Sequence, residues 1–270
     1  MIVFPNCKIN LGLHILNKRE DSFHNIETIL YPVRWCDALE AIPSEEFSFR
    51  VEGGKIEGSP EDNLCVKAFR LLEKELGIPP VKMCLLKNIP TGAGLGGGSS
   101  DAAFTLKLLN DLFELKLSAD QLKHFASQLG SDCTFFVDNK PCLATGRGNE
   151  LRGIDVDLSS HYITIVYPNI KISTAWAYAK SKPVSAQAEV KSLVDILKLP
   201  VNEWKGNLQN DFEEIVFKEY PEIASVKNML YENGALYSSM SGSGSSVFGI
   251  FKEEKEISFA ASYNIFRGKL

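Results

Sequence analysis

One stretch of the sequence combines glycines, two serines and an aspartate in front of an apolar helical pattern. It reads PTGAGLGGGSSDAA from Pro90 to Ala103, and glycine occupies five of the nine positions from 92 to 100. Glycines let backbone N–H groups approach an anion without a clash from Cβ atoms. Because the first N–H groups of a helix are unpaired and its dipole is positive there, this stretch predicts a phosphate site. Ser99 and Ser100 add hydroxyl groups that could bind phosphate or a metal-bound water.

A lysine and an aspartate elsewhere in the chain are candidates for chemistry at such a site. Apolar and polar residues alternate over 7–15, which predicts a half-buried strand that presents Lys8 and Asn10 side by side. Asp132 follows Gly130, the end of a predicted helix, and precedes the apolar residues TFFV. Taken alone, Lys8 could be a solvated strand residue and Asp132 a helix cap or turn residue.

The glycine stretch fits other phosphate-binding patterns poorly. GAGLGG, from Gly92 to Gly97, matches the G-x-G-x-x-G of dinucleotide-binding folds, but two predicted helices follow it with no strand between them. The Walker pattern is absent, and so are the H-R-D and D-F-G signatures of protein kinases. A turn that packs closely on a neighbouring segment remains the structural alternative.

The elements that must position these residues alternate between strand and helix. Strands are expected at 26–33, 81–87 and 162–168, and helices at 63–77, 99–113 and 117–130, the last beginning with a Ser118–Gln121 capping box. Helices are also expected at 190–197 and 222–234, followed by two strands around the turn SGSGS. This mixture predicts an α+β protein with two domains, 1–155 and 156–270, divided near a polar break at 152–160.

Composition narrows the class of protein. A net charge of −5 does not favour binding to nucleic acid or to an anionic membrane, so neither partner is expected. The six cysteines form no C-x-x-C pair and lie within apolar runs, which favours buried thiols over a metal site or a disulfide framework. We see neither a signal peptide nor an apolar run long enough to span a membrane, and we expect a cytoplasmic protein.

Five segments of the chain, in order and spread over nearly its whole length, resemble one family. PTGAGLGGGSSDAA resembles the second motif of the GHMP kinases, P-x-x-x-G-L-G-S-S-A-A, and PNCKINLGLHI (5–15) resembles the first motif. MSGSGSSVFG (240–249) resembles the third motif, and FHNIETI (23–29) and GSDCTFFV (130–137) resemble further segments of one member of the family. The resemblance implies a ribosomal protein S5 domain 2-like N-terminal domain and a ferredoxin-like C-terminal domain, with the active site in the cleft between them.

The resemblance also implies roles for individual residues. Asp132 falls at the position of the family's catalytic base, and Lys8 at that of the lysine which keeps this base ionised and offsets charge in the transition state. ATP is the implied cofactor, with Mg²⁺ implied by the phosphate charge and no side-chain metal ligand assigned. The residues expected to bind ATP are Asn63, Leu64, Lys87, Pro90, Gly92, Ala93, Gly94, Leu95, Gly96, Gly97, Gly98, Ser99 and Ser100.

A cytidine diphosphate-linked methylerythritol is the substrate that the resemblance implies. Its cytosine would lie between the rings of Phe23 and Tyr178, with Trp176 as a competitor for the second position, and would be read by His24. Asn10 and Thr174 are candidates for polar contacts with the substrate. In the third motif, Gly242, Ser243 and Gly244 could either clamp substrate or pack a turn against the phosphate loop.

Two segments depart from the family pattern. The usual D-G-Y-H is DSFH here, which keeps an aromatic ring at Phe23 but loses a phenolic hydroxyl. The usual G-S-D-V-P-F-F is GSDCTFF, so that Cys133 and Thr134 replace valine and proline and the turn after Asp132 is expected to be less rigid.

The implied activity is ATP-dependent phosphorylation of the substrate's 2-hydroxyl in the non-mevalonate isoprenoid precursor pathway. The nearer alternative is another GHMP small-molecule kinase, acting on mevalonate, homoserine or a sugar. A nucleotide sensor without catalysis is a second alternative, although a sensor would not need both Lys8 and Asp132. A Rossmann dehydrogenase is a remote third alternative. The sequence does not indicate an oligomeric state.

Overall fold

The computed structural model describes residues 1–54, 58–181 and 192–270. These residues form two compact units that interleave along the chain. The first unit contains Met1–Cys7, Trp35–Thr91 and Gly96–Lys140; the second contains Lys8–Arg34, Gly92–Leu95 and Pro141–Leu270. The division of the sequence at residue 155 stays a prediction.

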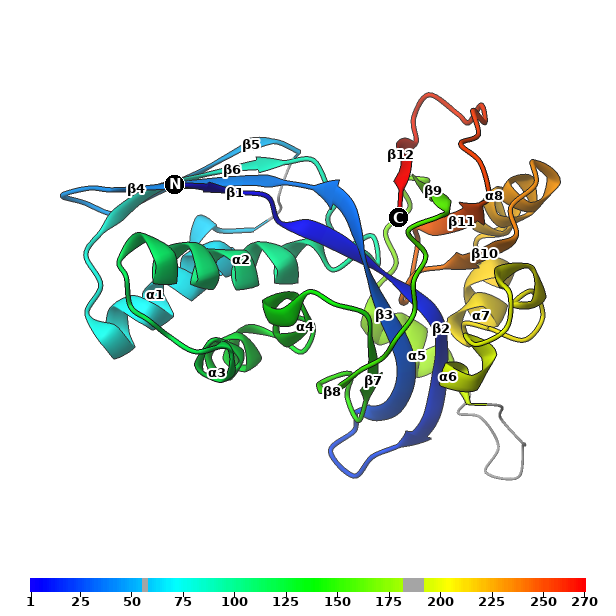
Figure 1. Cartoon of the computed structure of the whole chain (residues 1–270), viewed down its shortest axis with the longest axis horizontal. Helices are drawn as coiled ribbons and strands as arrows, with labels where there is room; N and C mark the ends of the chain where they lie inside the picture. Colours follow the sequence, from blue (N-terminus) through cyan, green and yellow to red (C-terminus); the bar gives the residue numbers. More distant parts are fainter. Residues whose placement is uncertain (55–57, 182–191) are drawn as a thin grey trace. The chain divides into compact units, whose positions relative to one another are not determined.

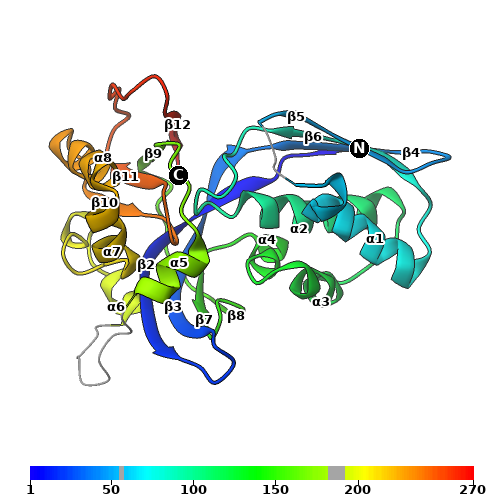
Figure 2. The same ribbon diagram turned by 180° about the vertical axis from the view of Figure 1, so that it is seen from behind.

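The first unit is a four-stranded sheet covered by helices. The strand order is β1 (Ile2–Val3), β4 (Ala38–Pro43), β6 (Val81–Lys87) and β5 (Ser48–Gly53), in which β5 runs parallel to β6 and the other pairs are antiparallel. The helices are η1 (Pro60–Asp62), α1 (Leu64–Leu76), α2 (Gly97–Leu112), α3 (Ala119–Leu129) and α4 (Cys133–Asp138). The α helices lie on one side of the sheet, and α2, which contacts β1 and β4, is close beneath it (Figures 1 and 2).

Local signals explain where these helices begin and end. The Asn63 side chain accepts a hydrogen bond from the Cys65 amide and so caps α1, which ends at Gly77 in the left-handed conformation. Both bonds of the predicted Ser118–Gln121 capping box are present at the start of α3. The predicted helices 63–77, 99–113 and 117–130 are therefore confirmed as α1, α2 and α3.

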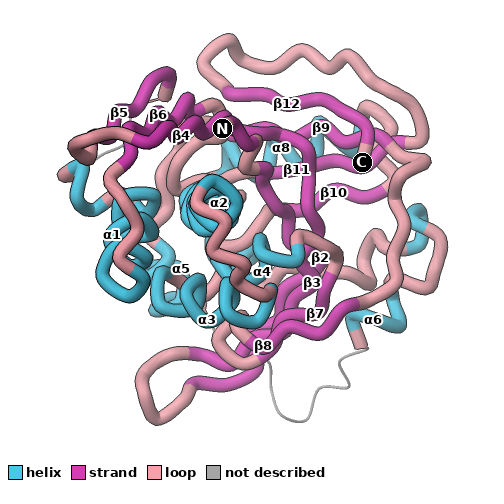
Figure 3. Tube along the Cα trace, turned by 60° about the vertical axis from the view of Figure 1, so that its left-hand side comes forward, coloured by secondary structure: helices cyan, strands magenta, loops and turns pink. Residues whose placement is uncertain are grey.

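The second unit contains two sheets. One has the order β2 (Asn6–Lys18), β3 (His24–Cys36), β7 (Cys142–Thr145) and β8 (Glu150–Gly153); the first two residues of β2 and the last two of β3 belong to the first unit. The other is antiparallel, with the order β10 (Tyr237–Met240), β11 (Val247–Phe251), β9 (Tyr162–Tyr167) and β12 (Asn264–Lys269) (Figure 3). Its helices are α5 (Thr174–Lys180), α6 (Leu193–Ile196), η2 (Val201–Glu203), α7 (Phe212–Glu219) and α8 (Pro221–Glu232).

The antiparallel sheet has the strand order of a ferredoxin-like domain. Helices connect β9 to β10, a tight turn joins β10 to β11, and β12 returns to pair with β9. A loop over residues 252–263 takes the place of the second crossover helix. Helix α8 packs on β10 and β11, and α7 packs on α8, which buries an apolar cluster that includes Val216, Val226 and Leu230.

Three expectations differ from the structure. The segment 7–15 was expected to be a half-buried strand, but both faces of β2 are buried from Asn6 to Ile15, including Lys8, Asn10 and His14. Helix α4 occupies the apolar residues after Asp132, where no helix was expected. The expected helix 190–197 appears as α6 only over Leu193–Ile196, and its first two residues, 190 and 191, lie outside the described part of the chain.

Candidate active site

The glycine-rich loop leads from β6 into α2 with a backbone that only glycine adopts easily. Gly92, Gly94 and Gly96 have φ angles of 66°, 79° and 69°. Gly96 is the N-cap of α2 and no side chain caps the helix there. The N–H groups of the first turn of α2 therefore lack a side-chain acceptor, which leaves this end of the helix suited to an anion.

The third motif packs against one of these glycines. A Cβ atom built on Gly94 would lie 2.1 Å from the Ser241 carbonyl oxygen and 3.0 Å from that of Gly244. The Ser246 amide donates to the Ala93 carbonyl oxygen at 3.1 Å. The third motif thus packs a turn against the phosphate loop, and its alternative role of clamping substrate stays a prediction.

Lys8 is buried on β2 and is held by two oxygen acceptors. Its Nζ donates to Asn10 Oδ1 at 2.7 Å and to the Gly94 carbonyl oxygen at 3.1 Å. Asn10 in turn donates from Nδ2 to Thr28 Oγ1 at 2.9 Å. The Asn10 side chain, which was predicted to contact substrate, thus orients the lysine through its oxygen and is itself fixed through its nitrogen.

Ser241 uses the same two acceptors as Lys8. Its hydroxyl donates to the Gly94 carbonyl oxygen at 2.9 Å, lies 3.3 Å from Asn10 Oδ1, and accepts a hydrogen bond from the backbone N–H of Asn10 at 3.3 Å. Sequence reasoning missed Ser241, although it lies inside the third motif next to Gly242. Only the fold brings a residue more than two hundred positions away to the Asn10 side chain.

In the first unit, Lys87 lies between two buried carboxylates. Its Nζ donates to Asp37 Oδ2 and, at 2.8 Å, to Asp101 Oδ2, and all three side chains are almost wholly buried. Burial acts to lower the pKa of Lys87, but the carboxylates of Asp101 and Asp37 outweigh it, so the pKa is raised. The side chain of Lys87, one of the predicted ATP-binding residues, is thus committed to Asp37 and Asp101.

The pKa of Asp101 is raised in this buried cluster. Burial raises its pKa to about 7, against the pull of Lys87, and the charge of Asp37 adds to the rise. A Cβ atom on Gly97 would come within 3.0 Å of Lys87 Nζ and of Ile89 Cγ2. The cluster therefore sits directly beneath the first turn of α2 and fixes it to the end of β6.

Asp132 is the N-cap residue of α4, but its side chain makes no capping hydrogen bond to that helix. The residue is partly exposed. Thr134, which stands where the family pattern has proline, donates from its hydroxyl to the Ser131 carbonyl oxygen at 3.2 Å. That bond closes the turn around Asp132 and makes up part of the rigidity that is lost without the proline. Burial raises the pKa of the neighbouring Cys133 thiol to about 11, so this cysteine stays protonated at neutral pH.

Leu64, one of the residues predicted to bind ATP, lies beside the first turn of α2. Asn63 caps α1 through its side chain, and Leu64 begins that helix. The Leu64 Cδ1 atom lies 3.8 Å from the place of a Cβ on Gly98. The structure therefore brings Leu64 and the glycine loop together within the first unit.

The aromatic residues expected to hold the base lie in the second unit, in two separate contacts. The ring of His24 stacks on Tyr178, with centroids 5.0 Å apart and planes 15° apart. Phe23 is half-exposed, and the guanidinium of Arg147 lies 3.6 Å from its ring centroid. Burial lowers the pKa of His24, and Lys18 lowers it further. Phe23 and Tyr178 thus each have one face covered by a neighbouring side chain.

Trp176, the alternative to Tyr178, makes a different kind of contact. It packs edge-on against Tyr220 with centroids 5.9 Å apart, beside the apolar cluster of the second unit. Thr174, at the start of α5, is exposed, and its hydroxyl lies 3.0 Å from that of Ser243. Trp176 thus has the surroundings of a packing residue, whereas Thr174 has those of a residue that is open to a ligand.

Few described residues could hold a metal ion by themselves. Among residues 1–54, 58–181 and 192–270, no group of three or more His, Cys, Asp or Glu side chains is arranged to bind one. Two buried oxygens at the start of α2, Ser100 Oγ and Asp101 Oδ1, have no hydrogen-bond partner.

Within residues 1–54, 58–181 and 192–270, no helix is long and apolar enough to cross a bilayer.

Comparison with known proteins agrees with this geometry. Residues 63–140 match the model of the GHMP kinases N terminal domain, and residues 195–268 match that of the GHMP kinases C terminal. A 4-diphosphocytidyl-2-C-methyl-D-erythritol kinase of Bacteroides thetaiotaomicron is 50% identical, over 100% of both chains. The crystal structure of a 4-(cytidine 5'-diphospho)-2C-methyl-D-erythritol kinase is similar with a TM-score of 0.77 at 29% identity, covering 93% of this chain and 90% of that one.

A mevalonate kinase structure is similar in fold alone. It has a TM-score of 0.72 but only 15% identity, over 99% of this chain and 98% of that one. Similarity at that level reports a shared architecture and leaves the substrate open.

Proposed function

The chain belongs to the GHMP kinases, and from this membership we propose that it transfers the γ-phosphoryl group of ATP to the 2-hydroxyl of 4-diphosphocytidyl-2-C-methyl-D-erythritol. The proposal for the substrate is supported by the full-length similarity at 50% identity to a protein of that name. The observation that carries the proposed phosphoryl transfer is the glycine-formed N-terminus of α2, which no side chain caps. Mevalonate and homoserine are less favoured because the structural likeness to their kinases lies at 15–18% identity.

The loop is suited to the phosphate chain of ATP. Its alternate glycines at 92, 94 and 96 turn the backbone without Cβ atoms, and Gly97 and Gly98 begin the helix. Ser99 and Ser100 follow in the first helical turn. ATP, when bound, supplies the γ-phosphoryl group, with ADP as the leaving group, and the helix dipole and amide groups would hold the negative charge of its phosphates.

The residues present fit a magnesium ion held largely by phosphate oxygens. Mg²⁺ prefers oxygen ligands and usually keeps several waters beside one or two protein groups. The unpartnered Ser100 hydroxyl and Asp101 Oδ1 are oxygen donors at the start of α2, next to the phosphate loop. We propose that Ser100 is the first protein group to contact the metal, directly or through water.

Asp132 is the proposed base for the attacking hydroxyl. A carboxylate can accept a hydrogen bond from a substrate alcohol and take its proton as the bond to phosphorus forms. Lys8 is the proposed positive group that offsets charge in the transition state. Its hydrogen bonds to Asn10 and to the Gly94 carbonyl fix the ammonium in place before substrate binds, so no reorganisation is needed during the reaction.

Recognition of the cytosine is assigned to Phe23, His24 and Tyr178. The stacking of His24 on Tyr178 shows that a flat group fits against the Tyr178 ring. We propose that the base stacks between Phe23 and Tyr178. Thr174 is the proposed polar contact at the start of α5.

The proposed substrate can be tested by comparing acceptors. Purified protein with Mg-ATP should release ADP in the presence of 4-diphosphocytidyl-2-C-methyl-D-erythritol. With mevalonate or homoserine, which lack the base, the release of ADP should be at least about 100-fold slower. Equal rates with mevalonate or homoserine would reject the proposed substrate but not the proposed kinase activity. Release of ADP at one low rate with every acceptor would reject phosphoryl transfer to any of them.

A further inference from the structure

A five-residue segment before and at the start of α7, Gln209–Glu213, contacts both β2 and the third motif. We call it the anchoring segment. On one side it forms a parallel bridge to β2, in which the Leu13 amide donates to the Gln209 carbonyl oxygen at 2.8 Å and the Asp211 amide donates to that of Leu13 at 2.9 Å. The Asp211 carboxylate also accepts the Ile15 amide at 2.8 Å and contacts His14 Nδ1 at 3.2 Å.

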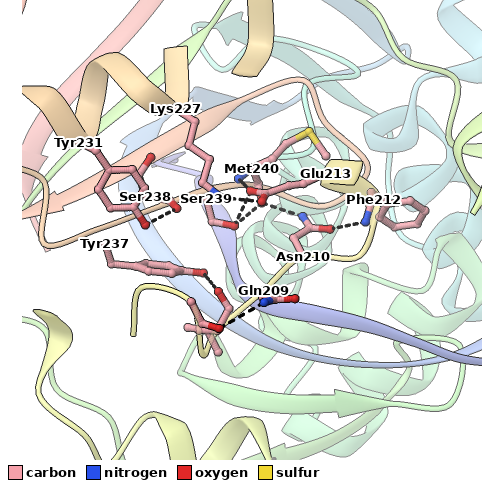
Figure 4. Close-up of polar contacts among 12 residues, drawn as sticks. Gln209, Asn210, Phe212, Glu213, Lys227, Tyr231, Tyr237, Ser238, Ser239 and Met240 are labelled. Atoms are coloured by element: carbon pink, nitrogen blue, oxygen red, sulfur yellow. Dashed lines mark hydrogen bonds and ion pairs between the residues drawn. The ribbon is translucent and has the colours of Figure 1, made fainter. Parts of the chain in front are cut away.

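On its other side the anchoring segment holds β10 and the third motif (Figure 4). Glu213 Oε1 accepts the Met240 amide at 2.8 Å and the Ser239 hydroxyl at 3.0 Å, while Oε2 pairs with Lys227 at 2.5 Å. The Asn210 amide nitrogen donates to the carbonyl oxygens of Met240 at 2.8 Å and Gly242 at 2.9 Å. Asn210 is buried, and its Oδ1 accepts the Phe212 amide.

The two carbonyls that Asn210 binds belong to the residues on either side of Ser241. Both amide hydrogens of one side chain thereby fix the backbone direction of that serine. The Ser241 hydroxyl then reaches Asn10 Oδ1 and the Gly94 carbonyl oxygen, the same two acceptors that Lys8 Nζ uses. A chain of hydrogen bonds runs from Asn210 through the backbone around Ser241 and its hydroxyl to the acceptors of the proposed catalytic lysine.

We infer that Asn210 is a positioning residue for Lys8, acting through Ser241 and the two acceptors they share. It contacts no reacting atom itself. If its two donors are lost, Ser241 can turn away, and Asn10 and Gly94 no longer hold the ammonium in one place. Misplacing a charged group by about 1 Å can lower a rate by about 100-fold without any contact to substrate. This inference rests on the proposed function, because it assigns Asn210 to the same reaction.

Asn210→Asp is the sharpest test. It keeps the size of the side chain and the acceptor for Phe212, but puts an oxygen in place of the nitrogen that faces two carbonyls. We expect kcat to fall by about ten- to a hundredfold, while KM for ATP and for the acceptor changes by less than about threefold. Asn233→Asp is the matched control: Asn233 donates to a carbonyl at the end of α8, is exposed, and should leave kcat unchanged.

Ser241→Ala separates positioning from a general loss of stability. It removes one hydroxyl and should lower kcat to a similar degree. In the double variant with Asn210→Asp, kcat should be no more than about threefold below that of the worse single variant, since both changes break one path. Effects that multiply would mean independent roles and would overturn the inference. Circular dichroism checks folding; if Asn210→Asp does not fold, wild-type kcat in Ser241→Ala overturns it instead.

A readout without activity keeps this inference separate from the proposed function. Lys8 is buried, so in the wild type it should react with acetic anhydride more slowly than exposed Lys252, as measured by mass spectrometry. Asn210→Asp should raise labelling of Lys8 severalfold relative to Lys252, and Asn233→Asp should not. Unchanged labelling in folded Asn210→Asp would contradict the inference even if the wild type phosphorylates none of the acceptors.

Discussion

At the scale of single residues, Lys87, Asp37 and Asp101 form a buried charged cluster in the first unit. Two carboxylates share one ammonium in a dry environment, so the cluster carries one negative charge in excess when all three groups are ionised. Burial raises the pKa of Asp101 to about 7, so this carboxyl holds its proton more tightly than an ordinary aspartate does. The helix that carries the phosphate loop is therefore fixed by a charged group that titrates near neutral pH.

This cluster predicts a pH dependence of stability. Because the pKa of Asp101 is raised in the folded state from an ordinary value of 3.8, the folded protein binds more protons than the unfolded chain between about pH 4 and pH 7. The contribution of Asp101 to stability is thus greatest below about pH 4 and is lost as the pH rises through 7. Asp101→Asn should flatten that part of the pH profile in urea unfolding, whereas Asp155→Asn in an exposed loop should not.

Removing the ammonium should be far more harmful than removing one carboxylate. Lys87→Met leaves Asp37 and Asp101 buried without a positive partner, and we expect a loss of about 3–5 kcal/mol in the free energy of unfolding at pH 8. The loss should shrink at pH 5, where Asp101 is protonated. A loss below 1 kcal/mol at pH 8 would mean that the cluster is not ionised as described.

At the scale of elements, the glycine loop is fixed by the third motif at one position and open at another. Gly94 and Gly92 both have positive φ angles, but a Cβ would meet the Ser241 carbonyl oxygen at 2.1 Å on Gly94 and nothing within 4 Å on Gly92. The two glycines therefore make a matched pair in which backbone strain is similar and packing differs.

Alanine substitution at this pair separates the two effects. Gly92→Ala should cost about 1–2 kcal/mol of stability, the ordinary cost of a left-handed conformation. Gly94→Ala should cost more, because the loop or the third motif must move, and it should also lower kcat by disturbing the carbonyl that accepts from Lys8. Chemical denaturation and steady-state kinetics on both variants would check this; equal losses in both variants would contradict the packing described for Gly94.

Strong local signals explain which elements could be predicted from sequence. Capping residues, glycine stops and regular apolar spacing predicted α1, α2 and α3 correctly. The strands β4 and β5 were missed because their pairing with β6 depends on contacts distant in sequence. Burial of the polar face of β2 could not be read from alternation, since Lys8 and Asn10 satisfy each other and the loop within the folded unit.

The candidate site divides in the same way. The glycine loop, Lys8 and Asp132 were found through motif and resemblance, and their roles stay predictions. Ser241 and Asn210 were not found, because nothing local distinguishes a serine in a glycine turn or an asparagine before an acidic helix. Their contacts with Asn10 and with the backbone around Ser241 exist only once distant segments meet.

At the scale of the whole molecule, the proposed function requires two different nucleotides to bind. A ligand that binds only the folded protein raises its stability, by about 2.7 kcal/mol at a hundred times the dissociation constant. Mg-ADP and CDP should each raise the melting temperature, and both increases should be observed when the two ligands are present together. NAD should not raise the melting temperature. CDP that protects no better than uridine diphosphate would contradict the assignment of Phe23, His24 and Tyr178 to the base.

The most direct test of the central claim is single-turnover transfer of ³²P from [γ-³²P]ATP to 4-diphosphocytidyl-2-C-methyl-D-erythritol, measured for the wild type and for Asp132→Asn. The account predicts labelled product in the wild type and a rate lower by about 10²–10⁴-fold in the variant, with ATP binding retained. Labelled product at the wild-type rate in Asp132→Asn would contradict the role of the base. No labelled product from the folded, ATP-bound wild type would contradict the proposed function itself.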